Sequence, residues 1–362
     1  MIPNVLFLLL AAMLLSCRAP VATAVEKPYV FPSFPAEPYP MERRSPLSWA
    51  ELADLLASNT TLVDRTGTLR PEELPSPTPL TCGRCLLGTT HRVRCEAGPP
   101  LGGYVLDPPQ PATASIVFLH GFTDTPFIYS TFFRSALRVA PNLFASVRVA
   151  VPLAPVFAGR PAAGVAAADI FAWYNAADFA EATMPALVNA PDAAAAEVVL
   201  LADAAAVDRL RLFLSTRRVE AVVARERAAL WNSGAPGSWR VLLVGHSLGA
   251  TVAIHVPVVS RSRLNGVVLL QGFLPGTRTL LASNETSHTG ARGYAVDMVA
   301  GGADPTVSPP VVKASAGILR GLLNGSVEIK YTVLEGVQHS SFFSPGSDVE
   351  AVVGVLRLFL EE

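Results

Sequence analysis

The sequence predicts an α/β protein with a mostly parallel central sheet flanked by helices, and with a helical insertion ahead of one central strand. Short, largely apolar runs alternate with segments of helical pattern, as in sheets whose strands are buried on both faces. One such run, residues 240–244 with an arginine at its first position, continues directly into Gly245-His246-Ser247-Leu248-Gly249. The interval before it, residues 176–232, is longer than a single crossover helix requires.

The composition is that of a globular protein with a substantial core. Of the 362 residues 51% are hydrophobic, and the formal net charge is −1. A chain of this length can form one large α/β domain or two smaller ones. Because basic residues are not in excess, we expect no nucleic-acid partner.

Residues 1–24 have the pattern of a signal peptide. Residues 5–16 are apolar up to the final serine, a run too short for a comfortable membrane span. Ala22-Thr23-Ala24 offers a small-x-small cleavage site, although no positive charge precedes the apolar run. We therefore expect a secreted protein or one of the secretory pathway. Two alternatives stay open: an uncleaved leader that anchors the chain in a membrane, or a lipoprotein anchored through Cys17.

Residues 25–100 are predicted to form a Pro-rich N-terminal extension with a small Cys-containing segment. Three cysteines remain after removal of the leader: Cys82, Cys85 and Cys95. An oxidising compartment favours one disulfide among them. A zinc site that includes His91 is the alternative, but a single compact cluster without a second CxxC does not favour it.

The strands are predicted from apolar runs bounded by turns. His91–Cys95 and Gly103–Leu106 are expected to form an antiparallel pair, and the run 115–119, apolar after its initial serine, follows. The remaining strands are expected at 147–152, 240–244, 266–270, 294–299 and 327–333. Two serines at helix-cap positions, Ser308 and Ser347, indicate that helices follow the last two strands.

Residues 176–232 form the expected helical insertion. They are alanine-rich and contain two predicted helices, at about 192–206 and 217–231. A cap over a functional site and an extra packing helix fit this pattern equally well.

Ser247 is the candidate nucleophile. A serine hydroxyl is a weak nucleophile, and a sharp turn from strand to helix compensates by holding it exposed at a helix N-terminus. That turn strains the serine backbone, and side chains at the positions of Gly245 and Gly249 would collide. The apolar strand before the motif and the helix-compatible run after it make it more specific than a Gly/Ser turn without chemistry.

Two aspartates could supply an acid for such a serine. Asp297 lies inside a strand pattern, where a carboxylate is more typical of a structural role. Asp304 follows that strand in a turn, Gly301-Gly302-Ala303-Asp304-Pro305, which places its carboxylate at the carboxyl edge of the sheet. Ligands and catalytic groups collect at that edge in open α/β sheets, and we therefore assign the acid to Asp304.

His339 is the candidate base among six histidines. It follows the last expected strand and is the last histidine in the chain. We expect His120 to shape the loop after its strand, and His246 to point with its neighbours rather than at the serine. Proton removal by His339, with Asp304 fixing its tautomer, leads to an acyl-serine that water then hydrolyses.

The tetrahedral intermediate of such a reaction needs two backbone N–H donors for its oxyanion. Leu248, the residue after the nucleophile, supplies one. The loop after the strand that ends at His120 and Gly121 supplies the other, and we assign it to Phe122.

With these residues placed, the chain resembles the phospholipase/carboxylesterase family, which contains acyl-protein thioesterases and small esterases. The matching segments recur in family order over about residues 103–360. They are Phe118-Leu119-His120-Gly121-Phe122-Thr123-Asp124, Pro152-Leu153-Ala154-Pro155-Val156, Trp173-Tyr174, Gly245-His246-Ser247-Leu248-Gly249, Leu274-Pro275, Gly302-Ala303-Asp304-Pro305 and Glu335-Gly336-Val337-Gln338-His339-Ser340-Ser341. The order serine, aspartate, histidine is also that of the triad in α/β-hydrolases.

The resemblance implies an α/β-hydrolase domain over residues 101–362, without metal or cofactor, and carries Ser247, Asp304 and His339 over as its triad. One departure is Leu248, which stands where the family usually has glutamine after the serine. Because the oxyanion donor is a backbone N–H, we expect the chemistry to survive this change. The longer segment 176–232 is the second departure, and it leaves the route of substrate entry open.

The expected activity is hydrolysis of carboxylic esters or thioesters of acyl chains, as in carboxylesterases and palmitoyl-protein thioesterases. Family members that remove palmitoyl groups from proteins work in the cytosol, and we therefore expect an exported relative to act instead on lipid or small carboxylic esters. Lipid or a membrane surface is a candidate contact. A lysophospholipase and a non-catalytic hydrolase-fold binding protein are the alternatives, and the sequence leaves the oligomeric state open.

Overall fold

The computed structural model describes residues 90–96, 101–122, 124, 126–154, 172–174, 183–202, 209–233, 239–259, 264–275, 294–323, 327–339 and 347–361. All of them fall within one compact unit, Phe31–Glu362. The expected leader, the proline-rich arm, Cys82 and Cys85 lie outside the described residues.

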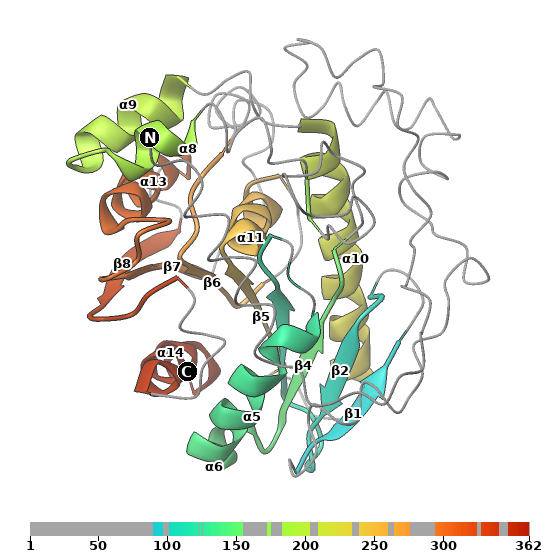
Figure 1. The fold of residues 1–362 in the computed structure, drawn as a ribbon. Helices are drawn as coiled ribbons and strands as arrows, with labels where there is room; N and C mark the ends of the chain where they lie inside the picture. The colour runs from blue at the N-terminus through green and yellow to red at the C-terminus, as the bar shows by residue number, and fades with distance from the viewer. Residues whose placement is uncertain are drawn as a thin grey trace, which may run out of the picture. The chain divides into compact units, whose positions relative to one another are not determined.

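The described strands form one eight-stranded sheet in the order β1-β2-β4-β3-β5-β6-β7-β8 (Figure 1). Strands β1 and β2 pair antiparallel, as do β2 and β4, and every later pairing is parallel. The strands are β1 Arg92–Cys95, β2 Tyr104–Asp107, β3 Ala114–Leu119, β4 Val147–Val151, β5 Arg240–His246, β6 Gly266–Leu270, β7 Ala295–Gly301 and β8 Glu328–Leu334. The prediction of a mostly parallel sheet is therefore confirmed.

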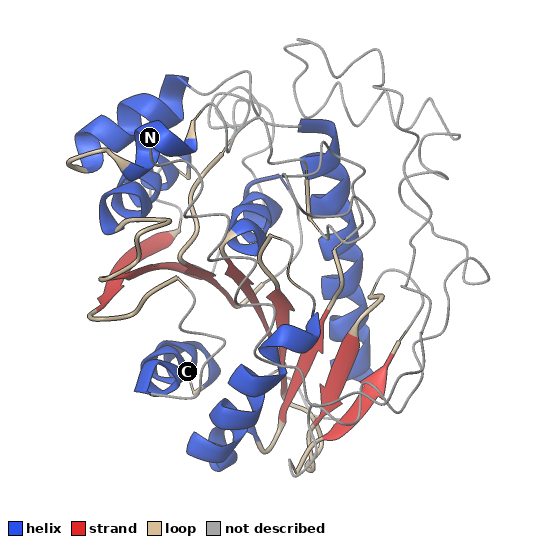
Figure 2. Ribbon diagram, in the orientation of Figure 1, coloured by secondary structure: helices blue, strands red, loops and turns tan. Residues whose placement is uncertain are grey.

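Helices cover both faces of this sheet (Figure 2). Helices α5, α6 and α14 lie on one face, and α10, α11 and α13 lie on the other. The helices are η2 Pro126–Tyr129, α5 Ser130–Val139, α6 Pro141–Phe144, α8 Met184–Val188, α9 Ala193–Ala202, α10 Arg209–Asn232, α11 Leu248–Val259, α13 Pro309–Leu322 and α14 Ser347–Leu360. None of the helices described is both long and apolar enough to cross a membrane.

The central strands divide their side chains between two cores. In β3, Ile116 and Phe118 pack with α5 and α14, whereas Val117 and Leu119 pack with the helices of the opposite face. Successive strand residues point to opposite faces, and because helices cover both faces nearly every position of β3 is apolar, the exception being Ser115, which is bonded to Glu226. This explains why the runs that predicted the strands are continuous rather than alternating.

The described part of the insertion contains a packing helix. Helix α10 contacts β3, β5 and α11, and it connects β4 to β5 as the crossover helix of a parallel sheet does. Its Glu226 is fully buried and accepts hydrogen bonds from Arg148 Nε at 2.6 Å and Ser115 Oγ at 2.9 Å. Helix α10 begins at Arg209, earlier than the sequence predicted, whereas α9 contacts α13.

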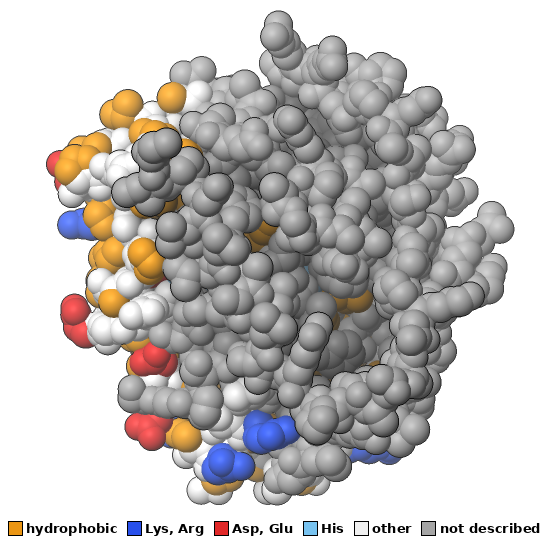
Figure 3. Space-filling view, viewed as in Figure 1, with side chains coloured by type: hydrophobic (Ala, Val, Ile, Leu, Met, Phe, Trp, Pro, Cys, Tyr) orange, Lys and Arg blue, Asp and Glu red, His pale blue; other side chains and the backbone are white. Residues whose placement is uncertain are grey.

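Helices α8 and α9 carry some of the exposed large hydrophobic side chains of the described surface, Val188 and Val198 among them. Figure 3 shows hydrophobic side chains over this part of the surface, at the upper left. Single apolar residues of this kind are normal on the surfaces of monomeric proteins, and they do not by themselves indicate a partner.

Cys95 at the end of β1 is disulfide-bonded, to a partner outside the described residues. The prediction of a disulfide is confirmed for this cysteine, and its pairing stays a prediction. A disulfide sulfur is not a thiolate, which is the form that ligates zinc. His91 Nε2 instead lies 3.0 Å from the carbonyl oxygen of Phe144. The alternative of a zinc site with Cys95 and His91 is therefore wrong.

Candidate active site

Ser247 occupies a sharp turn between β5 and α11. Its φ of 52° lies in the left-handed region, which costs a non-glycine residue about 1–3 kcal/mol. The Ser247 N–H donates to the carbonyl oxygen of Leu270 at 2.9 Å, and its carbonyl oxygen accepts from the N–H groups of Ala250 and Thr251 at the start of α11. These bonds hold the serine in the strained conformation that the sequence predicted.

The two glycines of the motif leave no room for side chains. A Cβ on Gly245 would lie 2.5 Å from the carbonyl oxygen of Gly249, and one on Gly249 would lie 2.4 Å from that of Leu119. Both contacts are with backbone, which cannot move aside as a flexible side chain can. The strand and the helix therefore approach each other closely only because these positions are glycine.

The structure brings Ser247, His339 and Asp304 together in a row. His339 Nε2 lies 2.9 Å from Ser247 Oγ, and His339 Nδ1 lies 2.8 Å from Asp304 Oδ2. Ser247 lies after β5, Asp304 after β7 and His339 after β8, and all three therefore meet at the carboxyl edge of the sheet. This is the edge at which the sequence placed them.

Asp304 is held from its other side by backbone. Its Oδ1 accepts hydrogen bonds from the N–H groups of Thr306 at 2.8 Å and Val307 at 2.9 Å, and only 4% of the residue is exposed. The carboxylate therefore accepts the Nδ1–H of His339 through its remaining oxygen. With the proton on Nδ1, the Nε2 atom is free to accept the Ser247 hydroxyl proton.

Asp297, the rejected candidate for the acid, lies elsewhere. It is buried within β7 opposite Lys330 of β8, and Thr332 Oγ1 donates to its carboxylate at 2.9 and 3.0 Å. Burial raises the pKa of Asp297, and the Thr332 hydroxyl and the charge of Lys330 oppose this. Its role in the fold is structural.

The loop that carries Phe122 lies beside the serine. A Cβ on Gly121 would be 3.4 Å from the Cβ of Ser247, and Phe122 follows directly. Leu248 is the first residue of α11, where backbone N–H groups lack partners within the helix. The two backbone groups assigned to the oxyanion therefore come from two different segments, each next to Ser247.

His120 determines which way the peptide group between Gly121 and Phe122 faces. The N–H of Ala154 donates to His120 Nε2 at 2.9 Å, and the proton of the neutral ring is therefore on Nδ1, which donates to the carbonyl oxygen of Gly121 at 2.9 Å. Burial lowers the pKa of His120 to about 4, which keeps the ring neutral. In a trans peptide the N–H points away from the preceding C=O, so that this bond orients the N–H of Phe122.

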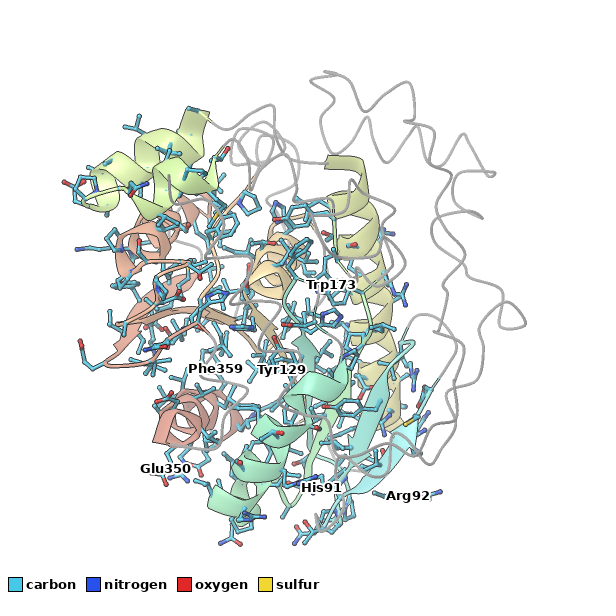
Figure 4. All side chains as sticks on the ribbon, viewed as in Figure 1. His91, Arg92, Tyr129, Trp173, Glu350 and Phe359 are labelled. Carbon is cyan, nitrogen blue, oxygen red and sulfur yellow. The ribbon has the colours of Figure 1, made fainter. Side chains whose placement is uncertain are left out.

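Trp173 also holds this loop in place. Its indole N–H donates to the carbonyl oxygen of His120 at 2.8 Å, and its ring lies 5.3 Å from that of His120. Trp173, labelled in Figure 4, is fully buried. The sequence singled this residue out only as part of a matching segment, and its contact with the loop was not predicted.

A second set of polar side chains connects this loop to the loop of His339. Tyr129 OH, labelled in Figure 4, lies 2.7 Å from both Asp124 Oδ2 and His246 Nδ1. His246 Nε2 lies 3.1 Å from Gln271 Oε1, and Gln271 Nε2 donates to the carbonyl oxygen of Gln338 at 3.0 Å. The sequence offered one signal that was not used: Gln271 is a polar residue directly after a wholly apolar strand.

Among the residues that the structure describes, no group of three or more His, Cys, Asp or Glu side chains is arranged to hold a metal ion. The titratable groups at the site are instead joined by hydrogen bonds to one another and to backbone.

Residues 197–352 match the family model described as phospholipase/carboxylesterase. None of the curated proteins matches the chain by sequence. The solved structure of a single-residue variant of Arabidopsis thaliana SOBER1 is similar with a TM-score of 0.50 at 17% identity, and it covers 68% of this chain and 99% of that chain. Acyl-protein thioesterase 2 of Zea mays gives a TM-score of 0.47 at 20% identity, with 74% and 99% covered. A carboxylesterase from Mesorhizobium loti gives 0.43 at 15%, with 69% and 89% covered.

The family match confirms the resemblance found in the sequence, and the sheet with its flanking helices is that of the α/β-hydrolase fold. The matched residues include the serine turn, Asp304 and His339. The match supports hydrolase activity, whereas the likeness to the SOBER1 variant, at 17% identity, shows the fold alone.

Proposed function

We propose that the protein is a serine hydrolase that cleaves carboxylic esters or thioesters of acyl chains through an acyl-serine intermediate. The observation that carries this proposal is the row of two hydrogen bonds from Ser247 through His339 to Asp304, with the serine in a strained turn at a helix N-terminus. Nucleophile, base and orienting carboxylate are within hydrogen-bond reach of one another, as nucleophilic catalysis requires.

In the first half of the reaction the acyl group passes to the enzyme. His339 Nε2 accepts the Ser247 hydroxyl proton as Oγ bonds to the substrate carbonyl carbon. The carboxylate of Asp304 stabilises the imidazolium and keeps its ring in place. When the tetrahedral intermediate collapses, the carbon–oxygen or carbon–sulfur bond to the leaving group breaks, and His339 returns the proton to that leaving group.

The developing oxyanion is bound by the backbone N–H groups of Phe122 and Leu248. Loss of one donor of this kind typically lowers turnover by about 100- to 1000-fold, and the loop is therefore as important as the triad. His120 and Trp173 support the first donor, because they bond the peptide groups on either side of Gly121.

In the second half water replaces the leaving group. His339 removes a proton from water, the oxygen bonds to the acyl carbon, and the bond to Ser247 Oγ breaks as the serine regains its proton. The products are a carboxylic acid and the free enzyme. Because all three triad members are in contact, a non-catalytic binding protein is the weaker alternative.

The substrate class is tested by comparing three kinds of acyl donor with one enzyme. A chain-length series of p-nitrophenyl esters measures ester cleavage, an acyl thioester measures thioesterase activity, and a lysophospholipid measures the alternative activity. Ser247→Ala serves as the background for each. Cleavage of none of the three by the wild type, or equal cleavage by Ser247→Ala, would reject the proposal, and preference for the lysophospholipid would favour the alternative.

We further propose that the chain is exported, with residues 1–24 removed as a signal peptide. The disulfide at Cys95 supports this, because structural disulfides persist in oxidising compartments. N-terminal sequencing of protein recovered from the medium or the secretory pathway tests the proposal. Recovery of the chain in the cytosol, with its initial residues intact, would contradict it.

A further inference from the structure

Four side chains, Asp124, Tyr129, His246 and Gln271, form a continuous series of hydrogen bonds, and the ring of His246 lies 5.1 Å from that of His339. The proposed reaction uses none of them. At one end, the N–H of Gly121 donates to Asp124 Oδ2 and to Tyr129 OH, each at an N–O distance of 3.1 Å. The other end bonds the carbonyl oxygen of Gln338, directly before His339. The directions of these hydrogen bonds can be worked out from that second end.

The amide of Gln271 has its orientation fixed by backbone. Its Nε2 donates to the carbonyl oxygen of Gln338, and the opposite atom, Oε1, therefore faces His246 Nε2 at 3.1 Å. Because Oε1 only accepts, His246 must carry a proton on Nε2. The backbone of His339 is a second hydrogen-bond partner of this ring and raises its pKa, as a carbonyl that accepts an N–H does.

His246 carries only that one proton. The ring is 1% exposed, and burial, together with the nearby His339, lowers its pKa to about 3. A neutral ring with its proton on Nε2 has an unprotonated Nδ1, which can only accept. Tyr129 OH lies 2.7 Å from this nitrogen and must therefore donate its single proton to it.

The hydrogen bond between Tyr129 and Asp124 then requires a proton from the carboxyl group of Asp124. Tyr129 OH lies 2.7 Å from Asp124 Oδ2, and its own proton already lies toward His246. An ionised carboxylate at this distance would face the phenolic oxygen with no hydrogen between them. Desolvation raises the pKa of Asp124 to about 6, against opposing contributions from the Tyr129 hydroxyl, the nearby His339 and the N–H of Gly121. The contribution of Tyr129, the largest of the three, is lost when its proton points toward His246.

We propose that Asp124 is a neutral carboxylic acid that donates its proton to Tyr129, and thereby completes a directed hydrogen-bond chain joining the oxyanion loop, residues 120–122, to the loop of His339. Its role is positioning. A neutral Asp124 holds the N–H of Gly121 without placing a negative charge beside the site where the oxyanion develops. This role in catalysis rests on the proposed function, whereas the hydrogen-bond directions do not.

The tautomer of His246 tests the chain without any substrate. Nitrogen-15 NMR of histidine-labelled protein at pH 7 should show His246 neutral with its proton on Nε2. His120 is an internal reference with the opposite tautomer. The N–H of Ala154 donates to His120 Nε2, and the proton of the His120 ring therefore lies on Nδ1. Signals are assigned from spectra of His246→Gln and His120→Gln. A His246 ring protonated on Nδ1, or on both nitrogens, would overturn the proposal.

Infrared spectroscopy tests the proton of Asp124 directly. Wild-type protein at pH 7 should show a carboxylic acid C=O band that Asp124→Asn lacks. Asp297→Asn is the matched control, because it removes a buried aspartate that is bonded to Thr332 and should leave the band in place. Absence of any such difference between the wild type and Asp124→Asn overturns the proposal.

The positioning role is tested by rescue. Asp124→Ala lacks a donor toward Tyr129, and we expect it to lose about 100-fold in kcat, the scale of a lost oxyanion donor. Asp124→Asn offers an amide N–H to Tyr129 and should recover roughly tenfold or more of that loss. Equal loss in both variants overturns the positioning role. A wild-type enzyme that cleaves neither the esters, the thioester nor the lysophospholipid would refute the proposed function, and the two spectroscopic tests would still decide the protonation state.

Discussion

His339 Nε2 lies 2.9 Å from Ser247 Oγ, although 92 residues separate them in the chain. The two residues follow β5 and β8, which are not neighbours in the sheet, and the loop after β8 must therefore reach across β6 and β7. It does so in contact with the loop of the acid, because Gly302 N–H donates to the carbonyl oxygen of Leu334 and Ala303 N–H to that of Val337. Base and acid are therefore positioned as one unit against the serine.

Substitution of the serine hydroxyl should abolish covalent labelling. A fluorophosphonate probe bonds to a serine Oγ that an adjacent base activates, and His339 is the group hydrogen-bonded to Ser247. We expect the probe to label the wild type and to leave Ser247→Ala unlabelled in a gel assay. Ser146→Ala is the control, because its hydroxyl is bonded to Thr113 at the amino end of β4. Labelling that persists in Ser247→Ala would remove this residue from the role of nucleophile.

The two aspartates near β7 should differ sharply in their effect on turnover. Asp304→Asn keeps the shape of the side chain but loses the carboxylate that holds His339 in its productive tautomer, and we expect kcat to fall roughly 10⁴-fold. Asp297→Asn changes a carboxylate bonded to Thr332 and should leave kcat close to the wild-type value. Steady-state kinetics on a p-nitrophenyl ester compares the two variants. A larger loss in Asp297→Asn would reverse the assignment of the acid.

The close approach of strand and helix predicts opposite effects at two glycines. A Cβ on Gly249 would lie 2.4 and 2.5 Å from the carbonyl oxygens of Leu119 and His120, and Gly249→Ala should therefore destabilise the fold by about 3 kcal/mol. An exposed helix position, Gly317 of α13, has nothing within 4 Å of an added Cβ. Gly317→Ala should stabilise by roughly 0.5–1 kcal/mol. Urea denaturation measures both, and equal effects at the two positions would contradict the steric explanation.

Three buried histidines should make the fold sensitive to acid. Burial lowers the pKa of His120 and His255 to about 4 and that of His246 to about 3, all below the unfolded value of 6.5. Between these pH values the unfolded chain binds more protons than the folded one, so that stability is present above pH 6.5 and is lost as the pH falls. Each histidine should account for about 2 kcal/mol of the loss between pH 7 and pH 5.

The contribution of one histidine can be isolated at His255, whose Nδ1 bonds the carbonyl oxygen of Thr251 within α11. Urea denaturation of the wild type and of His255→Gln at pH 7 and pH 5 makes the comparison. We expect the variant to lose about 2 kcal/mol less than the wild type over this interval. The same loss in both proteins would show that His255 is not the source of acid sensitivity.

The sequence allowed prediction of the sheet and of the row of three residues at its edge, for physical reasons. The inner strands are nearly continuous apolar runs, and Asp304 follows one of them. His339 follows the edge strand β8, in which apolar and polar residues alternate. The hydrogen-bond chain of the four side chains Asp124, Tyr129, His246 and Gln271 was not predicted, because its contacts join elements far apart in sequence. Tyr129 and His246 are separated by 117 residues, and no periodicity specifies which buried polar groups face each other. The start of α10 was also missed, since tertiary packing rather than local pattern determines it.

The buried ion pair of α10 provides the last prediction. Glu226 is fully buried, and it accepts from Arg148 Nε at 2.6 Å while Arg148 also pairs with Asp107. Removal of one partner from a buried pair typically costs about 3–5 kcal/mol when the other charge is left uncompensated. In Glu226→Gln the Arg148 guanidinium keeps Asp107 as a partner, and we therefore expect a destabilisation of about 3 kcal/mol or less in urea denaturation. Glu361→Gln is the exposed control, since it breaks a surface pair with Arg357 that is worth at most about 1 kcal/mol.

A double variant separates the charge from the packing of α10. Apolar residues of similar volume can replace a buried ion pair at little or no cost, because neither charge then has to be desolvated. Glu226→Leu combined with Arg148→Met should therefore be more stable than Glu226→Leu alone, even though it removes more of the native contacts. If the double variant were less stable than Glu226→Leu, the network with Ser115 and Asp107 would contribute more than charge compensation. In that case the cost of the single substitution would come from lost hydrogen bonds rather than from an unpaired charge.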